Sequence, residues 1–127
     1  MKKIAAIIGL VSFLYGSTIW AAPPASVAGA WRASANNTLG VLNIIQGFSL
    51  SPCKPLSGTI FALQIDGYYC VNSGRIVFAR KNAAGAVFQF YEGQVNDGAV
   101  SSRIGGSFSI FNGATGRVDF NFSAIQP

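Results

Sequence analysis

Few residues in this chain could do chemistry. Its 127 residues include no histidine, two cysteines and four acidic residues. Histidine is the commonest general base near neutral pH, so its absence removes the ordinary Ser–His and Cys–His nucleophile pairs. Two cysteines without histidine are also too few ligands for a zinc or copper site. We therefore expect a protein without catalytic residues, metal or cofactor.

Three of the four acidic residues have a structural explanation. Asp66 and Asp97 each precede a glycine in an expected turn, a position where aspartate is favoured. Asp119 alternates with apolar residues and so falls on the polar face of its expected strand. None of the three therefore indicates an acid or a base.

Glu92 is the acidic residue of interest, because it shares a strand face with Phe88 and Phe90. Its carboxylate could lie in a cavity and act as the acid or base of a hydrolase. It could instead form an ion pair at the rim or surface with Arg80 or Arg103 from a neighbouring strand. We prefer the ion pair.

Polar side chains on the same expected strand indicate a binding site. Gln89 and Tyr91 lie on the opposite face from Phe88 and Phe90, so at least one polar side chain points inward whichever face is buried. Ligand sites combine an apolar lining with a few polar groups of this kind. The candidate binding residues are Gln89, Tyr91, Glu92, Arg80 and Arg103.

The first 22 residues have the order of a cleavable signal peptide. Two lysines come first, residues 4–14 are uncharged and mainly apolar, and residues 15–22 form a cleavage region. The apolar run is shorter than the roughly 20 residues of a membrane-spanning helix. We therefore expect cleavage rather than anchoring, and a mature protein that is periplasmic or secreted.

Cleavage is expected after Ala21 or Ala22, although a second small-residue site ends at Ala28. Residues 23–127 then form a single domain, with residues 23–28 as a flexible, proline-containing arm. This domain is too short for eight membrane-spanning strands with loops, so we expect no integral membrane association. The net charge of +5 includes the two signal-peptide lysines, and the other basic residues are scattered. Nucleic acid is therefore not an expected partner.

The two cysteines, Cys53 and Cys70, are expected to form a disulfide. An even number of cysteines in an exported chain favours pairing. Closing a loop of this size contributes roughly 3 kcal/mol to stability. The role of the cysteines is then structural.

After the arm, short β-rich segments alternate with turns that contain glycine and asparagine, the pattern of an all-β meander. Asp66-Gly67 predicts a two-residue hairpin turn, and residues 47–56, with two prolines, predict one long loop. The expected strands are 30–35, 39–46, 58–65, 68–71, 75–81, 86–95, 100–111 and 117–125.

These strands carry apolar residues on one face and polar residues on the other. Short hairpins of this kind either stack as two sheets or close, and closure also removes exposed sheet edges. We predict an eight-stranded antiparallel up-and-down barrel. Its aromatic side chains fill the interior or line a cavity, and filling is preferred because such a barrel is narrow.

Gly29-Ala30-Trp31 opens the first expected strand, and Arg117 lies in the last. This arrangement resembles the calycin group of small exported barrels, which includes lipocalins, avidins and a bacterial metalloprotease-inhibitor family. The resemblance implies that Trp31 packs against Arg117 and closes one barrel end. Biotin binding is not implied, because avidins use several tryptophans and Trp31 is the only one left after cleavage. The cysteines are placed differently from those of the inhibitor family, so no functional residue is carried over.

These observations predict a non-catalytic binding protein. Its ligand is a small apolar molecule or a protein partner, bound at an open barrel end near residues 47–56 and the Tyr91-Glu92 strand. One alternative is a periplasmic inhibitor or antigen-type surface factor that makes protein–protein contacts through residues 23–27. A second alternative is a hydrolase with Glu92 as its acid or base.

Overall fold

The structure is a computed structural model that describes residues 22–98, 100–112 and 116–127. Apart from Ala22, the signal peptide expected over residues 1–22 lies outside the described residues. Within these residues no helix is long and apolar enough to cross a membrane. The strands are β1 (Gly29–Ala35), β2 (Thr38–Gln46), β3 (Cys53–Ile60), β4 (Leu63–Cys70), β5 (Arg75–Lys81), β6 (Val87–Asp97), β7 (Ser102–Asn112) and β8 (Gly116–Gln126).

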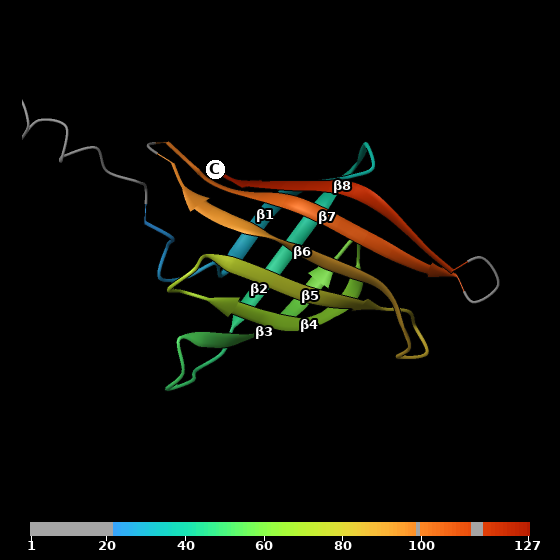
Figure 1. Ribbon diagram of the computed structural model, residues 1–127, viewed down its shortest axis with the longest axis horizontal. Helices are drawn as coiled ribbons and strands as arrows, with labels where there is room; N and C mark the ends of the chain where they lie inside the picture. Colours follow the sequence, from blue (N-terminus) through green and yellow to red (C-terminus); the bar gives the residue numbers. More distant parts are fainter. Residues whose placement is uncertain (1–21, 99, 113–115) are drawn as a thin grey trace, which may run out of the picture.

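The strands form one closed antiparallel barrel in chain order. Each strand pairs with the next, and β1 pairs with β8, from Arg32 opposite Ile125 to Ala35 opposite Phe122. Figure 1 shows β1 and β2 crossing behind β5–β7, as in a strongly twisted sheet that closes on itself. The predicted eight-stranded meander barrel is confirmed.

Side chains pack the barrel interior, because alternate residues along each strand point inward. Tyr91 stacks on Phe78 and on Phe108, with ring centroids 4.8 Å and 4.9 Å apart. Phe122 packs edge-on against Tyr91 at 5.0 Å. These four aromatic residues therefore fill the interior, as preferred, whereas Tyr68, Phe90 and Phe111 are exposed. The largest fully buried side chains are Trp31, Tyr69, Tyr91, Phe78, Leu42, Ile60, Ile65, Ile76, Ile104, Val27 and Val95.

The turn between β3 and β4 differs from the prediction. Asp66 and Gly67 lie inside β4, and the turn is made by Phe61 and Ala62, whose φ angles are 47° and 67°. Positive φ is rare for residues other than glycine and asparagine, so this turn has no recognisable sequence signature. The predicted hairpin at Asp66-Gly67 is therefore wrong.

Gly67 lies where β4 and β5 approach each other closely, and not in a turn. A Cβ atom at this position would lie 1.9 Å from the carbonyl oxygen of Val77 on β5. The shifted turn also changes the strand bounds, because β3 begins within the predicted loop 47–56. The predicted strands 58–65 and 68–71 are replaced by β3 and β4, and the loop shortens to residues 47–52.

The predicted Cys53–Cys70 disulfide is present and joins the start of β3 to the end of β4. The two cysteines are directly opposite each other in the antiparallel pair. The bond therefore fixes this register at one end of the barrel.

The expected N-terminal arm packs onto the same end of the barrel. Val27 is fully buried, and its amide donates to Gln46 Oε1 at 2.9 Å. Trp31 Nε1 donates to the Val27 carbonyl at 2.9 Å, and the Tyr69 hydroxyl donates to the Pro24 carbonyl. Residues 23–28 were expected to form a flexible arm, but they pack against this end of the barrel, which we call the arm end.

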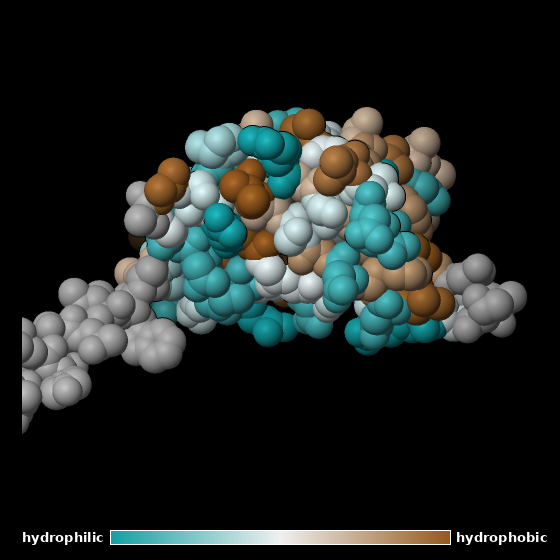
Figure 2. Space-filling model, turned by 90° about the horizontal axis from the view of Figure 1, so that it is seen from above, coloured by the Kyte–Doolittle hydropathy of each residue, from teal (hydrophilic) through white to brown (hydrophobic). Residues whose placement is uncertain are grey.

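The outer surface mixes apolar and polar side chains, as Figure 2 shows for one face. The most exposed apolar residues are Leu39, Phe48, Leu50 and Val100. Scattered exposed residues of this kind are normal for a folded protein.

Candidate functional site

The barrel end opposite the arm contains a recess of about 300 Å³, which we call the mouth. In Figure 1 the arm lies at the left, and the β5–β6 turn marks the opposite end at the right. The β1–β2 and β3–β4 turns contribute to the mouth. It is lined by Ala35, Asn36, Thr38, Phe61, Arg80, Gln89, Tyr91, Phe108 and Ile110.

The loop 47–52 lies instead at the arm end, between Gln46, which is hydrogen-bonded to Val27, and the Cys53–Cys70 disulfide. The binding site expected near residues 47–56 is therefore wrong, because the recess lies at the opposite end of the barrel.

Arg80 points into the mouth from β5, on the same strand face as the buried Phe78. Its Nε donates to the Ile60 carbonyl at 3.1 Å, and its Nη2 donates to the Phe61 carbonyl at 3.0 Å. The guanidinium carbon lies 5.4 Å from the Phe61 ring centroid and 5.1 Å from that of Phe88, within cation–π range. These contacts hold the charged group in one position.

Gln89 and Tyr91 meet Arg80 from the neighbouring strand β6. Arg80 Nη1 donates to Gln89 Oε1 at 3.0 Å, and the Tyr91 hydroxyl donates to the same oxygen at 2.8 Å. Both residues lie on the inward face of β6. Three of the five candidate binding residues therefore form one hydrogen-bonded group.

Tyr91 forms the buried floor of this group, with only 1% of its surface exposed. Burial raises its pKa from 10.0 to about 12, and the positive charge of Arg80 only partly opposes that rise. The hydroxyl is therefore protonated at neutral pH and acts as a hydrogen-bond donor, not as a base or nucleophile.

Glu92 and Arg103 do not take part in the mouth. Glu92 lies on the outer face of β6 and forms an ion pair with Arg75 at 2.9 Å, with 41% of its side chain exposed. The surface ion pair preferred for Glu92 is thus present, but Glu92 pairs with Arg75 and not with Arg80 or Arg103. Arg103 is exposed on β7, opposite Asn96, toward the arm end.

Trp31 and Arg117 are not brought together. Trp31 is buried near the arm end, next to Arg32, which pairs with Ile125 near the end of β8. Arg117 lies at the opposite end of β8, where its Nε donates to Asp119 at 2.7 Å. The calycin resemblance implied a contact between Trp31 and Arg117, and this expectation is wrong. The two residues lie at opposite ends of the barrel, separated by almost the full length of β8.

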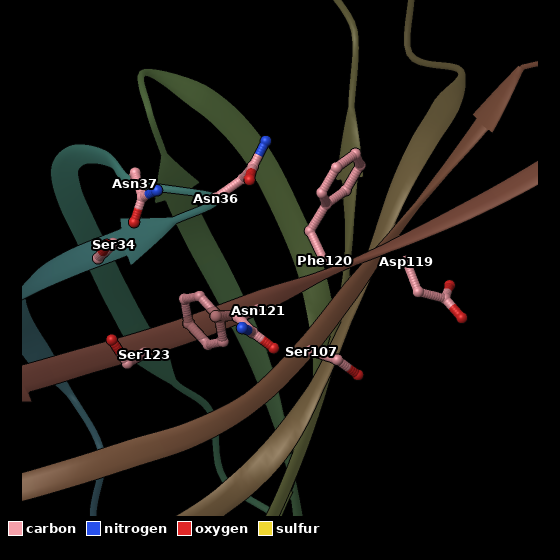
Figure 3. A pocket seen from close by; sticks show the side chains of 9 residues that line it. Ser34, Asn36, Asn37, Ser107, Asp119, Phe120, Asn121 and Ser123 are labelled. Carbon is pink, nitrogen blue, oxygen red and sulfur yellow. The ribbon is translucent and has the colours of Figure 1, made fainter.

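A second recess, of about 500 Å³, lies on the outer side of the barrel wall beside the β1–β2 turn. Figure 3 shows its side chains, with Phe120 and Asp119 on opposite sides of the β8 ribbon. A hydrogen bond from Ser109 and the Arg117 guanidinium lower the pKa of the Asp119 carboxyl. The recess is lined by Ser34, Asn36, Asn37, Ser107, Asp119, Phe120, Asn121, Phe122 and Ser123.

The mouth is the better candidate site, although the outer recess is larger. In the mouth, Arg80, Gln89 and Tyr91 are partly or fully buried and already held by hydrogen bonds. Most polar side chains of the outer recess are exposed to solvent. The mouth offers hydrogen-bond donors, one positive charge and aromatic surface. Among the described residues, no group of three histidine, cysteine or acidic side chains could hold a metal ion.

Six lining residues of the mouth were not among the candidate binding residues: Ala35, Asn36, Thr38, Phe61, Phe108 and Ile110. Asn36-Asn37 is a turn in which both residues have positive φ, a conformation that asparagine tolerates. The paired asparagines were therefore a usable signal for a turn at a barrel end. Phe61 carried no such signal.

No protein-family model and no curated protein matches the sequence of this chain.

Proposed function

We propose that this protein is an exported, non-catalytic binding protein that holds a small, mainly apolar molecule at the mouth. The observation that carries the proposal is the shared acceptor: Arg80 and Tyr91 both donate to Gln89 Oε1. Polar groups fixed before binding lower the entropic cost of capturing a ligand. Phe61 and Phe108 supply apolar surface beside them.

Export is supported by two independent features. The N-terminal sequence has the order of a signal peptide. The Cys53–Cys70 disulfide is typical of proteins that mature in an oxidising compartment. We therefore place the protein in the periplasm or outside the cell.

The two alternatives have weaker support. An inhibitor that acts through residues 23–27 would need that segment free, yet Val27 is buried and accepts the Trp31 indole N–H. A hydrolase that uses Glu92 would need a reactive carboxylate, yet Glu92 is paired with Arg75 on the outer face. The test below also detects a protein partner that binds through another surface.

Native mass spectrometry of the exported protein, purified from its own host, tests the proposal. We expect a retained molecule of small mass that is released when the protein is denatured. A copurifying protein in its place would favour the protein-contact alternative. Unliganded protein alone, in repeated preparations, would contradict small-molecule binding.

A pair of variants then locates the retained molecule. Thr38→Phe places a large side chain at the start of β2, in the lining of the mouth. The control variant, Asn43→Phe, introduces the same side chain on the exposed face of β2, outside the mouth. Loss of the retained mass only in Thr38→Phe is expected, and equal loss or equal retention in both would place the ligand elsewhere.

A further inference from the structure

We infer that the ligand of the mouth carries an oxyanion, either a carboxylate or a phosphate ester, and that Arg80 binds it. This inference rests on the proposed function. Arg80 is the charged side chain in the lining of the mouth, and it is half-buried. A charge that is partly removed from water is further stabilised when an opposite charge lies beside it.

No acidic side chain supplies that opposite charge. All four acidic residues of the sequence are among the described residues, and each has another partner. The pairs are Asp66 with Lys81, Glu92 with Arg75, Asp119 with Arg117, and Asp97 with the hydroxyl of Ser102. The positive charge at the mouth is therefore left for a ligand or solvent anion.

Arg80 also keeps unused hydrogen-bond donors. A guanidinium has five N–H donors, and the bonds from Nε, Nη1 and Nη2 to protein acceptors use one on each nitrogen. One N–H on each terminal nitrogen therefore has no acceptor among the described residues. A carboxylate or phosphate oxygen pair matches two donors of this kind.

The surroundings favour an anion that has an apolar body. The rings of Phe61 and Phe88 lie within cation–π distance of the guanidinium. Arg80 is partly buried, and partial removal from water strengthens attraction between opposite charges. Phe108 and Ile110 line the adjoining part of the mouth. A small amphipathic acid fits the charged and the apolar parts of the mouth, with its anion on Arg80 and its apolar part against these side chains.

Three probes of similar shape test the inference: phenylacetate, phenyl phosphate and the neutral phenylacetamide. Each is titrated into the mature protein at low ionic strength and followed by proton–nitrogen correlation NMR. Charge-assisted bonds of this kind are worth roughly 10- to 100-fold in affinity. We expect at least one of the two anions to bind that much more tightly than the amide, and their ratio identifies which oxyanion fits.

Variants assign the preference to Arg80. Arg80→Gln removes the charge, but it also removes bonds to the β3–β4 turn and could unfold the barrel. Gln89→Glu is therefore the second variant, because it keeps the side-chain shape and places a carboxylate beside Arg80. Both should lower anion affinity to that of phenylacetamide, while Arg103→Gln, on the exposed face of β7, should leave it unchanged.

Equal affinity for the amide and the anions, or a preference that survives Gln89→Glu, would overturn the inference. Absence of binding by both anions would overturn it as well. These three results leave the proposed function standing, because the native mass spectrum of the host-purified protein tests separately whether a small molecule is bound.

Discussion

The Tyr91 hydroxyl donates a 2.8 Å hydrogen bond to the side-chain oxygen of Gln89, two residues earlier on the inward face of β6. This bond links the stacked aromatic core to the charged mouth, because the same oxygen accepts from Arg80. The position of the guanidinium thus depends on a hydroxyl inside the barrel.

Tyr91→Phe should reduce the free energy of unfolding by about 1 kcal/mol. The substitution removes one buried donor and keeps the ring stack, and a typical hydrogen bond contributes about that amount. Urea unfolding measures the loss. Tyr68→Phe is the matched control, since Tyr68 is 57% exposed and should change stability by less than about 0.5 kcal/mol. Equal losses in the two variants would contradict a special role for the Tyr91 hydroxyl.

Stability should fall as the pH rises from 10 to 12. Burial raises the pKa of both Tyr69 and Tyr91 from 10.0 to about 12, and the charge of Asp97 adds to the effect on Tyr69. In this range the unfolded chain releases protons that the folded protein keeps, so unfolding becomes more favourable. Denaturant melts across this range test the slope, and the double variant Tyr69→Phe and Tyr91→Phe should flatten it. An unchanged slope would show that other groups cause the alkaline loss.

Trp31→Ala should destabilise the protein by about 3 to 5 kcal/mol, as expected for a large core truncation. Trp31 is 1% exposed and holds the arm through its bond to Val27. Arg117→Ala should leave the stability almost unchanged, because Arg117 is an exposed residue in a surface ion pair. Comparable losses of stability in the two variants would contradict the observed separation of Trp31 and Arg117.

The mature protein should begin at Ala22 or Pro23. A cut after Ala28 would remove Val27, which is fully buried and accepts the Trp31 indole N–H. Burying a polar group without a partner is unfavourable. N-terminal sequencing of exported material determines the cut, and a stable protein that begins at Gly29 would contradict this prediction.

The barrel could be predicted because it depends on a pattern that repeats along the chain. Alternation places Phe120 and Phe122 on one face of β8 and Asn121 on the other, and neighbouring strands repeat this arrangement. For the same reason Gln89 and Tyr91 were expected on one strand face, but the pattern left open whether that face points inward. Such patterns are local, so a single strand is enough to reveal them.

Non-local contacts explain what the pattern missed. The turn at Phe61 and Ala62 has unfavourable backbone angles, but the Cys53–Cys70 register and the bond from Arg80 to the Phe61 carbonyl hold it in place. The Trp31–Arg117 expectation failed because a two-residue resemblance does not give the register along β8. Only the complete set of strand pairs provides that information.

The two ends of the barrel chain meet on the side opposite the mouth. Gln126 Nε2 donates to the Ala28 carbonyl at 2.9 Å, and in Figure 1 the label C lies toward the same side as the arm. A protein immobilised through its C-terminus would therefore present the mouth to the surrounding solution. A biosensor chip or affinity resin loaded in this orientation could capture ligands from a cell extract without obstruction by its own attachment point. Linking the protein through the β5–β6 turn would block the same opening.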